Sequence, residues 1–178
     1  MLKKIEKAFD AFGTAIGGLT SIVLVLMIVN VFYDVVMRYF FNIGSIGFQE
    51  LEWHLFSIII MLGMSYTLQQ DGHVRVDVFY DNLSVTKQAF INIIGTLLFI
   101  IPVAIVIGYG SIDYVIESYQ SAEASGNPGG LTHRWIIKSL IPLSFLFLII
   151  SAIGFIVKQI NILQEYKSGQ NTLKGEQS

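Results

Sequence analysis

Three polar side chains recur at every fourth residue within a long apolar stretch. Asn30, Asp34 and Arg38 therefore share one stripe of a helix. Asp34 has two chemical interpretations: a proton or cation relay, or an ion pair with Arg38 that docks this helix onto another. We favour the ion pair, because an acid four residues before a base is the favourable order on a helix, and because Asp34 lies off-centre in the stretch.

A second polar group opens the next apolar segment. Glu50, Glu52 and His54 lie in the first turns of a predicted helix, where the helix dipole favours carboxylates. Glu50 and His54 share a face, whereas Glu52 points roughly the other way, so the group does not form a metal site. We expect Glu50 to contact Arg38 across a helical hairpin, or the group to contact a partner protein.

The remaining composition argues against an enzyme. There is no cysteine, which excludes disulfides, thiolate metal sites and cysteine nucleophiles. The three histidines are scattered at positions 54, 73 and 133, so neither a haem site nor a catalytic arrangement is indicated. A net charge of −2 without a basic cluster argues against a nucleic-acid partner. We predict no catalytic residue, no cofactor and no bound metal.

Uncharged runs at 11–33, 55–70, 88–112 and 139–157 must position these polar residues. A bilayer core about 30 Å thick needs roughly 20 apolar helical residues to cross it. The sequence therefore predicts an all-α integral membrane protein with four transmembrane helices, at about 17–41, 48–70, 87–119 and 135–162. Residues 1–166 form one domain, followed by a polar tail at 167–178 without regular structure.

Local patterns predict three further features. Apolar residues from Leu2 to Phe12 recur at helical spacing between charges, which indicates a short amphipathic lead-in that lies at the membrane surface before turning into the first span. Pro102 is expected to kink the third span. The glycine-rich segment 120–134 is expected to be a flexible loop.

Basic residues indicate the orientation. If both termini are cytoplasmic, the three basic residues on the outside are Arg38, Arg134 and Lys138, and the other eight of the 11 lie inside. Trp53 and Trp135 then lie near the outer ends of spans two and four, as interface anchors would. The sequence predicts an N-in, C-in arrangement.

One inner loop carries alternating charged and apolar residues, at His73, Arg75 and Asp77. Alternation is typical of a strand, but a single strand here has nothing to pair with. The segment could dock another subunit or contact lipid head groups, and from composition alone we favour a solvated loop.

The polar landmarks also follow a known order. The chain resembles the small membrane subunit, of the DctQ type, of tripartite ATP-independent periplasmic (TRAP) transporters, over roughly residues 9–164. The matching positions are Asn30-Val31, Arg38-Tyr39, Phe41-Asn42, Glu50-Leu51, Glu52, His73-Val74-Arg75-Val76-Asp77, Glu117-Ser118, Gly130-Leu131, Trp135 and Pro142. In one departure, the proline that relatives place shortly before the tryptophan of span four is displaced to Pro128.

The resemblance implies a division of labour in a bacterial inner membrane. A periplasmic substrate-binding protein delivers an organic acid, such as a dicarboxylate or sialic acid, and a large multispan subunit carries the substrate and sodium sites. The small subunit braces the large subunit's scaffold within the lipid bilayer. Arg38, Glu50, Glu52, His73, Arg75 and Asp77 are then structural or subunit contacts.

Two alternatives stay open from the residues themselves. The chain could be a stand-alone homodimeric transporter that uses Asp34 as its coupling carboxylate. It could instead be a membrane anchor or assembly subunit of another complex, with a soluble partner docked on residues 73–77.

Overall fold

The structure is all-helical within the residues that it describes, which are 2–70, 72, 80 and 82–175 of a computed structural model, with side chains through 167. Its elements are α1 (Leu2–Phe40), α2 (Ile46–Gln69), α4 (Val85–Gly95), the π-helical segment η1 (Thr96–Ile100), α5 (Ile101–Gln120) and α6 (Trp135–Gly175). Four helical stretches, Leu2–Phe40, Ile46–Gln69, Val85–Gln120 and Trp135–Lys167, are long and apolar enough to cross a membrane. The predicted all-α, four-span fold class is confirmed.

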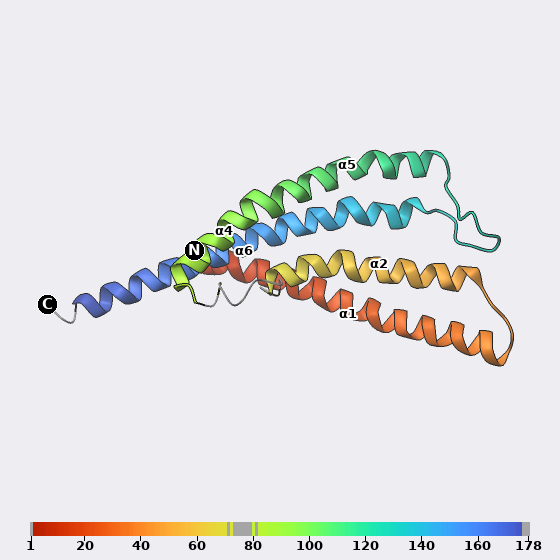
Figure 1. The fold of residues 1–178 in the computed structure, drawn as a ribbon, viewed down its shortest axis with the longest axis horizontal. Helices are drawn as coiled ribbons and strands as arrows, with labels where there is room; N and C mark the ends of the chain where they lie inside the picture. Colours follow the sequence, from red (N-terminus) through yellow and green to blue (C-terminus); the bar gives the residue numbers. More distant parts are fainter. Residues whose placement is uncertain (1, 71, 73–79, 81, 176–178) are drawn as a thin grey trace.

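The helices form two long hairpins that lie side by side (Figure 1). One hairpin joins α1 to α2, and the other joins the stretch α4–η1–α5 to α6. Both hairpin connections, residues 41–45 and 121–134, lie at the same end of the bundle, which we call the hairpin end. Both termini lie toward the other end, which we call the terminal end (Figure 1).

Helix α6 is the central element, because it packs against α1, α2, α4 and α5. Its core positions Phe145, Leu148, Ala152 and Phe155 are buried with Leu68 of α2. Small side chains bring the helices close together. At Gly154, an added Cβ would lie 2.7 Å from the Phe9 side chain of α1, so only glycine fits this crossing.

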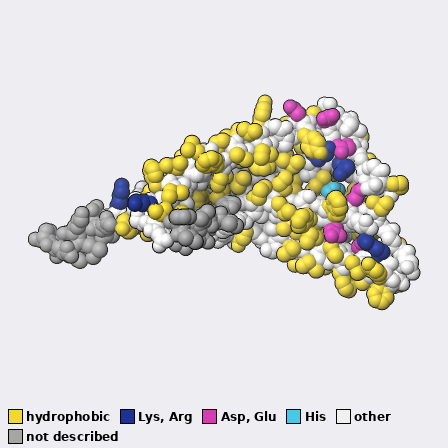
Figure 2. Space-filling view, in the orientation of Figure 1, with side chains coloured by type: hydrophobic (Ala, Val, Ile, Leu, Met, Phe, Trp, Pro, Cys, Tyr) yellow, Lys and Arg dark blue, Asp and Glu magenta, His cyan; other side chains and the backbone are white. Residues whose placement is uncertain are grey.

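The outside of the bundle is apolar. Phe32 of α1 is 69% exposed and Val106 of α5 is 72% exposed. On the face shown in Figure 2, most charged side chains gather at the hairpin end, some basic side chains lie toward the terminal end, and apolar side chains cover the middle. Such a continuous apolar exterior fits lipid or another membrane protein rather than water.

The predicted turn after the amphipathic lead-in is wrong, because α1 runs unbroken from Leu2 to Phe40. The lead-in packs against α6 instead of lying apart from the bundle. Phe12 and Phe147 stack edge to face with ring centroids 5.6 Å apart, and Phe9 meets Gly154. An amphipathic pattern suits a helix that packs on a neighbour as well as one that lies on a membrane surface.

Two further predictions concern the third span and the tail. A kink is predicted at Pro102, and the structure has a π-helical turn, η1, directly before α5, in whose first turn this proline lies. The tail is not irregular, because α6 continues through Gly175. Residues 155–167 contain neither glycine nor proline, so nothing in the sequence ends the helix where the fourth apolar run ends.

Candidate functional site

The polar stripe of α1 joins this helix to α2 and contains the expected ion pair. The Asn30 side-chain amide donates a hydrogen bond to the backbone oxygen of Phe48, at 3.0 Å. Asp34 is only 3% exposed and pairs with Arg38, whose side chain is about half exposed. The pair sits in the last turns of α1, next to the hairpin end. Its charges are therefore balanced within one helix.

Glu50 does not form the predicted clasp with Arg38. Its carboxylate accepts hydrogen bonds from the Ser125 hydroxyl, from the backbone N–H of Leu131 at 2.7 Å and from the Asn127 amide at 3.4 Å. The prediction fails because this face of α2 looks toward the 121–134 loop, while Arg38 is already held by Asp34. Glu50 thus ties the first hairpin to the connection of the second.

The 121–134 loop is consequently ordered rather than freely flexible. The backbone N–H of Ser125 donates to the oxygen of Leu131 at 2.9 Å, and that of Gly130 donates to Asn127 at 3.0 Å. Gly129 supplies the left-handed backbone that the turn requires, with φ of +81°. The glycines that predicted flexibility here build a compact turn around one carboxylate.

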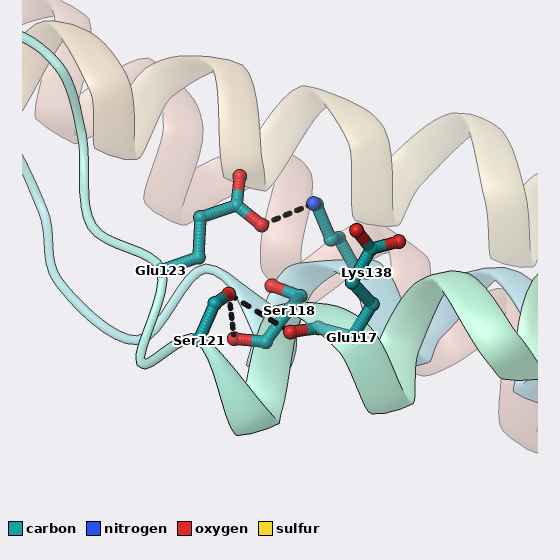
Figure 3. Close-up of polar contacts among 5 residues, drawn as sticks. All are labelled: Glu117, Ser118, Ser121, Glu123 and Lys138. Carbon is teal, nitrogen blue, oxygen red and sulfur yellow. Dashed lines mark hydrogen bonds and ion pairs between the residues drawn. The ribbon is translucent and has the colours of Figure 1, made fainter.

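A second ion pair, between Glu123 and Lys138, closes the base of the same loop (Figure 3). The Lys138 side chain is 12% exposed, and its ammonium lies 3.8 Å from the centre of the Tyr114 ring. The Lys138 ammonium holds the pKa of the Glu123 carboxyl below its ordinary value. Beside this pair, the Ser121 hydroxyl donates to the backbone oxygen of Glu117 at 2.8 Å (Figure 3).

Sequence reasoning named neither Glu123 nor Lys138 as a site residue. The available signal was Lys138 itself, a cation placed in the first turns of a strongly apolar span. Such a charge is costly unless it is paired, so it predicts an acidic partner nearby. Sequence spacing alone does not identify Glu123, which lies across the loop from Lys138.

The remaining predicted residues are dispersed. Glu52 is half-buried on α2, and His54 lines a cavity that also contains Glu50 and Arg134. His73, Arg75 and Asp77 lie outside the described residues. Within the described part of the chain, no group of three or more His, Cys, Asp or Glu residues could hold a metal ion.

Both tryptophans lie at the hairpin end, as interface anchors should. Trp135 begins α6 and stacks edge to face on Tyr119, with ring centroids 5.4 Å apart. Trp53 projects from α2 and is 74% exposed. The two tryptophans thus lie on two different helices at the same end of the bundle, and their role as interface anchors stays a prediction.

The terminal end carries polar contacts of another kind. Lys3 and Glu165 form an ion pair at 2.6 Å, but their side chains are 74% and 62% exposed. The Asn161 amide donates to the Glu6 carboxylate, which links α6 to α1. Gln69 of α2 donates to Asp10 of α1 at 3.4 Å. These contacts connect helix ends and do not enclose a site.

Comparison with known proteins gives the family. Residues 27–161 match the family described as tripartite ATP-independent periplasmic transporters, DctQ component. Two proteins of Haemophilus influenzae, each named as a TRAP transporter small permease protein, are similar along most of their length. One is 30% identical over 76% of this chain and 86% of its own length, and the other is 27% identical over 94% and 93%. The chain therefore belongs to the DctQ family of TRAP transporter components.

Proposed function

We propose that this protein is the small permease subunit of a sodium-driven organic-acid importer in the bacterial inner membrane. Its role is to brace the scaffold of the large transport subunit. Family membership supports the assignment to a tripartite transporter. The organic acid and the sodium dependence follow from the family resemblance and belong to the large subunit. The periplasmic substrate-binding protein joins through the complex.

The observation that carries this proposal is the distribution of polarity. Asp34 is paired with Arg38, Glu50 is enclosed by donors from the loop, and Glu123 is paired with Lys138. All of these contacts lie toward the hairpin end. A conduit for ions or acids needs ionisable groups along a path through the membrane. Within the described residues, the middle of the bundle instead contains buried serines and apolar side chains.

The apolar exterior supplies the bracing surface. Large side chains of α1, η1 and α5 project outward along much of each element. The most exposed of these include Ile22, Val25, Phe32, Leu98, Phe99, Val106 and Tyr109. A subunit that widens a membrane scaffold needs such faces, because contacts between helices in lipid depend on van der Waals packing.

The proposed orientation places the terminal end in the cytoplasm and the hairpin end in the periplasm. It rests on the distribution of the 11 basic residues, of which only Arg38, Arg134 and Lys138 belong to the hairpin side and the other eight to the terminal side. In this orientation the loop held by Glu50 faces the compartment from which the binding protein approaches.

The first test is purification of the tagged full-length chain from its host in a mild detergent, followed by mass spectrometry of the eluate. We expect a larger multispan protein in near-stoichiometric amount. A homodimer without any companion would contradict the proposal and would favour a self-sufficient transporter.

A double variant separates a brace from a conduit. Asp34→Asn combined with Arg38→Gln removes both charges, so it leaves no unpaired charge in the membrane. If the chain is a brace, uptake by the assembled transporter stays within about twofold of the parent. If Asp34 couples ion movement to transport, uptake is abolished while the complex still assembles.

A further inference from the structure

A cavity of about 410 Å³ opens at the hairpin end between α2, the start of α6 and the 121–134 loop. Its polar wall contains Glu50, His54 and Arg134, and its apolar wall contains Ile46 and Ile137. This volume lies within the range of small-molecule sites in proteins, about 300–1,000 Å³. The cavity is therefore large enough for the polar part of a ligand.

A second cavity, of about 200 Å³, lies beside the first and closer to the middle of the bundle. The two share Ser57, Arg134 and Ile137 as walls, and the second adds Met61, Leu140 and Ile141 together with Tyr114 and Lys138. Met61 is one helical turn farther from the hairpin end than Ser57. The combined space thus has a charged mouth near the membrane surface, and Met61, Leu140 and Ile141 give the second cavity an apolar wall, beside Lys138, whose charge is paired with Glu123.

The charged side chains of Glu50 and Arg134 at the mouth differ in the hydrogen bonds that they form. The Glu50 carboxylate accepts hydrogen bonds from three neutral donors of the loop. The backbone of Arg134 donates to Glu123, at 3.1 Å. Across the part of the chain that the structure describes, however, the Arg134 guanidinium has neither a hydrogen bond nor an ion pair. Arg134 is an exposed residue that lines both cavities, so its guanidinium is accessible and its planar donors are suited to bind a phosphate.

We propose that the two cavities form one binding site for a phospholipid. Arg134 binds the phosphate, and an acyl chain passes Ser57 to lie between α2 and α6, against Met61 and Leu140. Trp53 stands exposed at the mouth, at the level where an aromatic side chain meets lipid head groups.

The head group of this lipid is zwitterionic. An anionic head group would place a second negative charge beside Glu50, whereas the amine of phosphatidylethanolamine offsets the charge of its phosphate. The proposal does not depend on the role of the chain in transport, because it concerns only the walls of the two cavities.

The test uses phosphatidylethanolamine with a photoactivatable diazirine in one acyl chain, incorporated into membranes that contain the full-length protein with its natural partners. After illumination, the labelled peptides of this chain are mapped by mass spectrometry. We expect labelling of residues 57–61 and 137–141. Residues 146–153 of α6, where Leu146 and Ile153 are exposed outside both cavities and outside the proposed bracing surface, serve as the internal reference for labelling by bulk lipid.

Two variants of the cavity walls and one control variant separate a specific site from general lipid contact. Arg134→Gln should lower labelling of 57–61 and 137–141 at least about threefold, relative to 146–153. Lys4→Gln, which removes an exposed cation at the terminal end, should leave the ratio unchanged. Ser57→Leu fills the passage without changing charge and should lower the ratio at 137–141.

Ser57→Leu decides the question if the arginine variant does not accumulate. An unchanged labelling ratio in the variants that accumulate would overturn the proposal. So would labelling of 57–61 and 137–141 no stronger than that of bulk-lipid positions in the parent protein.

Discussion

The two ends of the helical bundle use polar side chains differently. At the hairpin end, paired side chains are shielded: Asp34 is 4% exposed at its side chain, and Lys138 is 12% exposed. At the terminal end, the ion pair between Lys3 and Glu165 is mostly in solvent. Removing one partner of a shielded ion pair strongly destabilises the folded protein, whereas exposed ion pairs contribute little to its stability. The hairpin end should therefore depend far more on its charges than the terminal end does.

Among the substitutions that test this difference between the two ends, that of Arg38 should change the free energy of unfolding most. Arg38→Gln leaves the Asp34 carboxylate buried without its counter-charge, and we expect a loss of about 2–3 kcal/mol in the free energy of unfolding. This lies below the usual range for buried pairs because Arg38 is half exposed. Thermal unfolding in detergent measures the loss. Adding Asp34→Asn should restore most of it, and a double variant as unstable as the single one would show that the pair is not the cause.

The same Arg38→Gln substitution should also lower the yield of assembled transporter more than it alters substrate affinity. Unchanged assembly with altered affinity would contradict a purely structural role for this residue.

Glu50→Gln should have the next largest effect, concentrated in the loop. The substitution removes the charge that strengthens three hydrogen bonds to residues 125–131. We expect a drop of several degrees in the melting temperature and faster amide exchange across 121–134. Glu52→Gln, two residues away on another face of α2, is the matched control and should change neither quantity. Equal effects of the two substitutions would show that loss of any carboxylate here has the same result.

Lys138→Met should cost about 1–2 kcal/mol of the free energy of unfolding. It removes both the ion pair with Glu123 and the contact with the Tyr114 ring, while it retains an apolar side chain of similar length. Chemical denaturation of the purified chain provides the measurement. Lys158→Met, a change of the same type in the terminal half of α6, is the comparison, and it should cost less.

Acid should weaken the same contact. The pKa of Glu123 lies below its ordinary value of 4.5 because of Lys138, so the folded state binds a proton less readily than the unfolded chain does. The pair therefore contributes its full stability above about pH 4.5, and the contribution is lost as the pH falls through the lowered pKa. Between about pH 6 and pH 3.5, the melting temperature of the parent should fall more than that of Glu123→Gln. Parallel curves would contradict this.

Lys3→Ala should produce the smallest effect, with no measurable change in the melting temperature. Its ion pair with Glu165 is exposed on both sides, so solvent and salt screen it. A clear loss of stability would mean that the terminal end is less different from the hairpin end than its exposure indicates.

The sequence predicted those features that depend on residues close together in the chain. Uncharged runs predicted the four spans because crossing a membrane requires only length and hydropathy. The Asp34–Arg38 pair was predictable because both partners lie on one helix, four residues apart. The contacts of Glu50 were not, since Ser125 and Leu131 are 75 and 81 residues away in the chain. Their meeting depends on how α2 is rotated against the second hairpin.

The π-helical turn before Pro102 accommodates one residue more than the regular spacing of buried positions in the third span would need. The buried positions of this span are Ala89, Asn92, Thr96, Ala104, Ser111 and Ser118. Five of them, all but Asn92, repeat every seven residues before and after the turn and are eight apart across it. Loss of one residue from 97–99 would restore the regular repeat and keep both halves facing α6. Gain of one residue would rotate one half by about 100° and turn its seam toward lipid. We therefore expect this segment to tolerate the loss of one residue but not the gain of one.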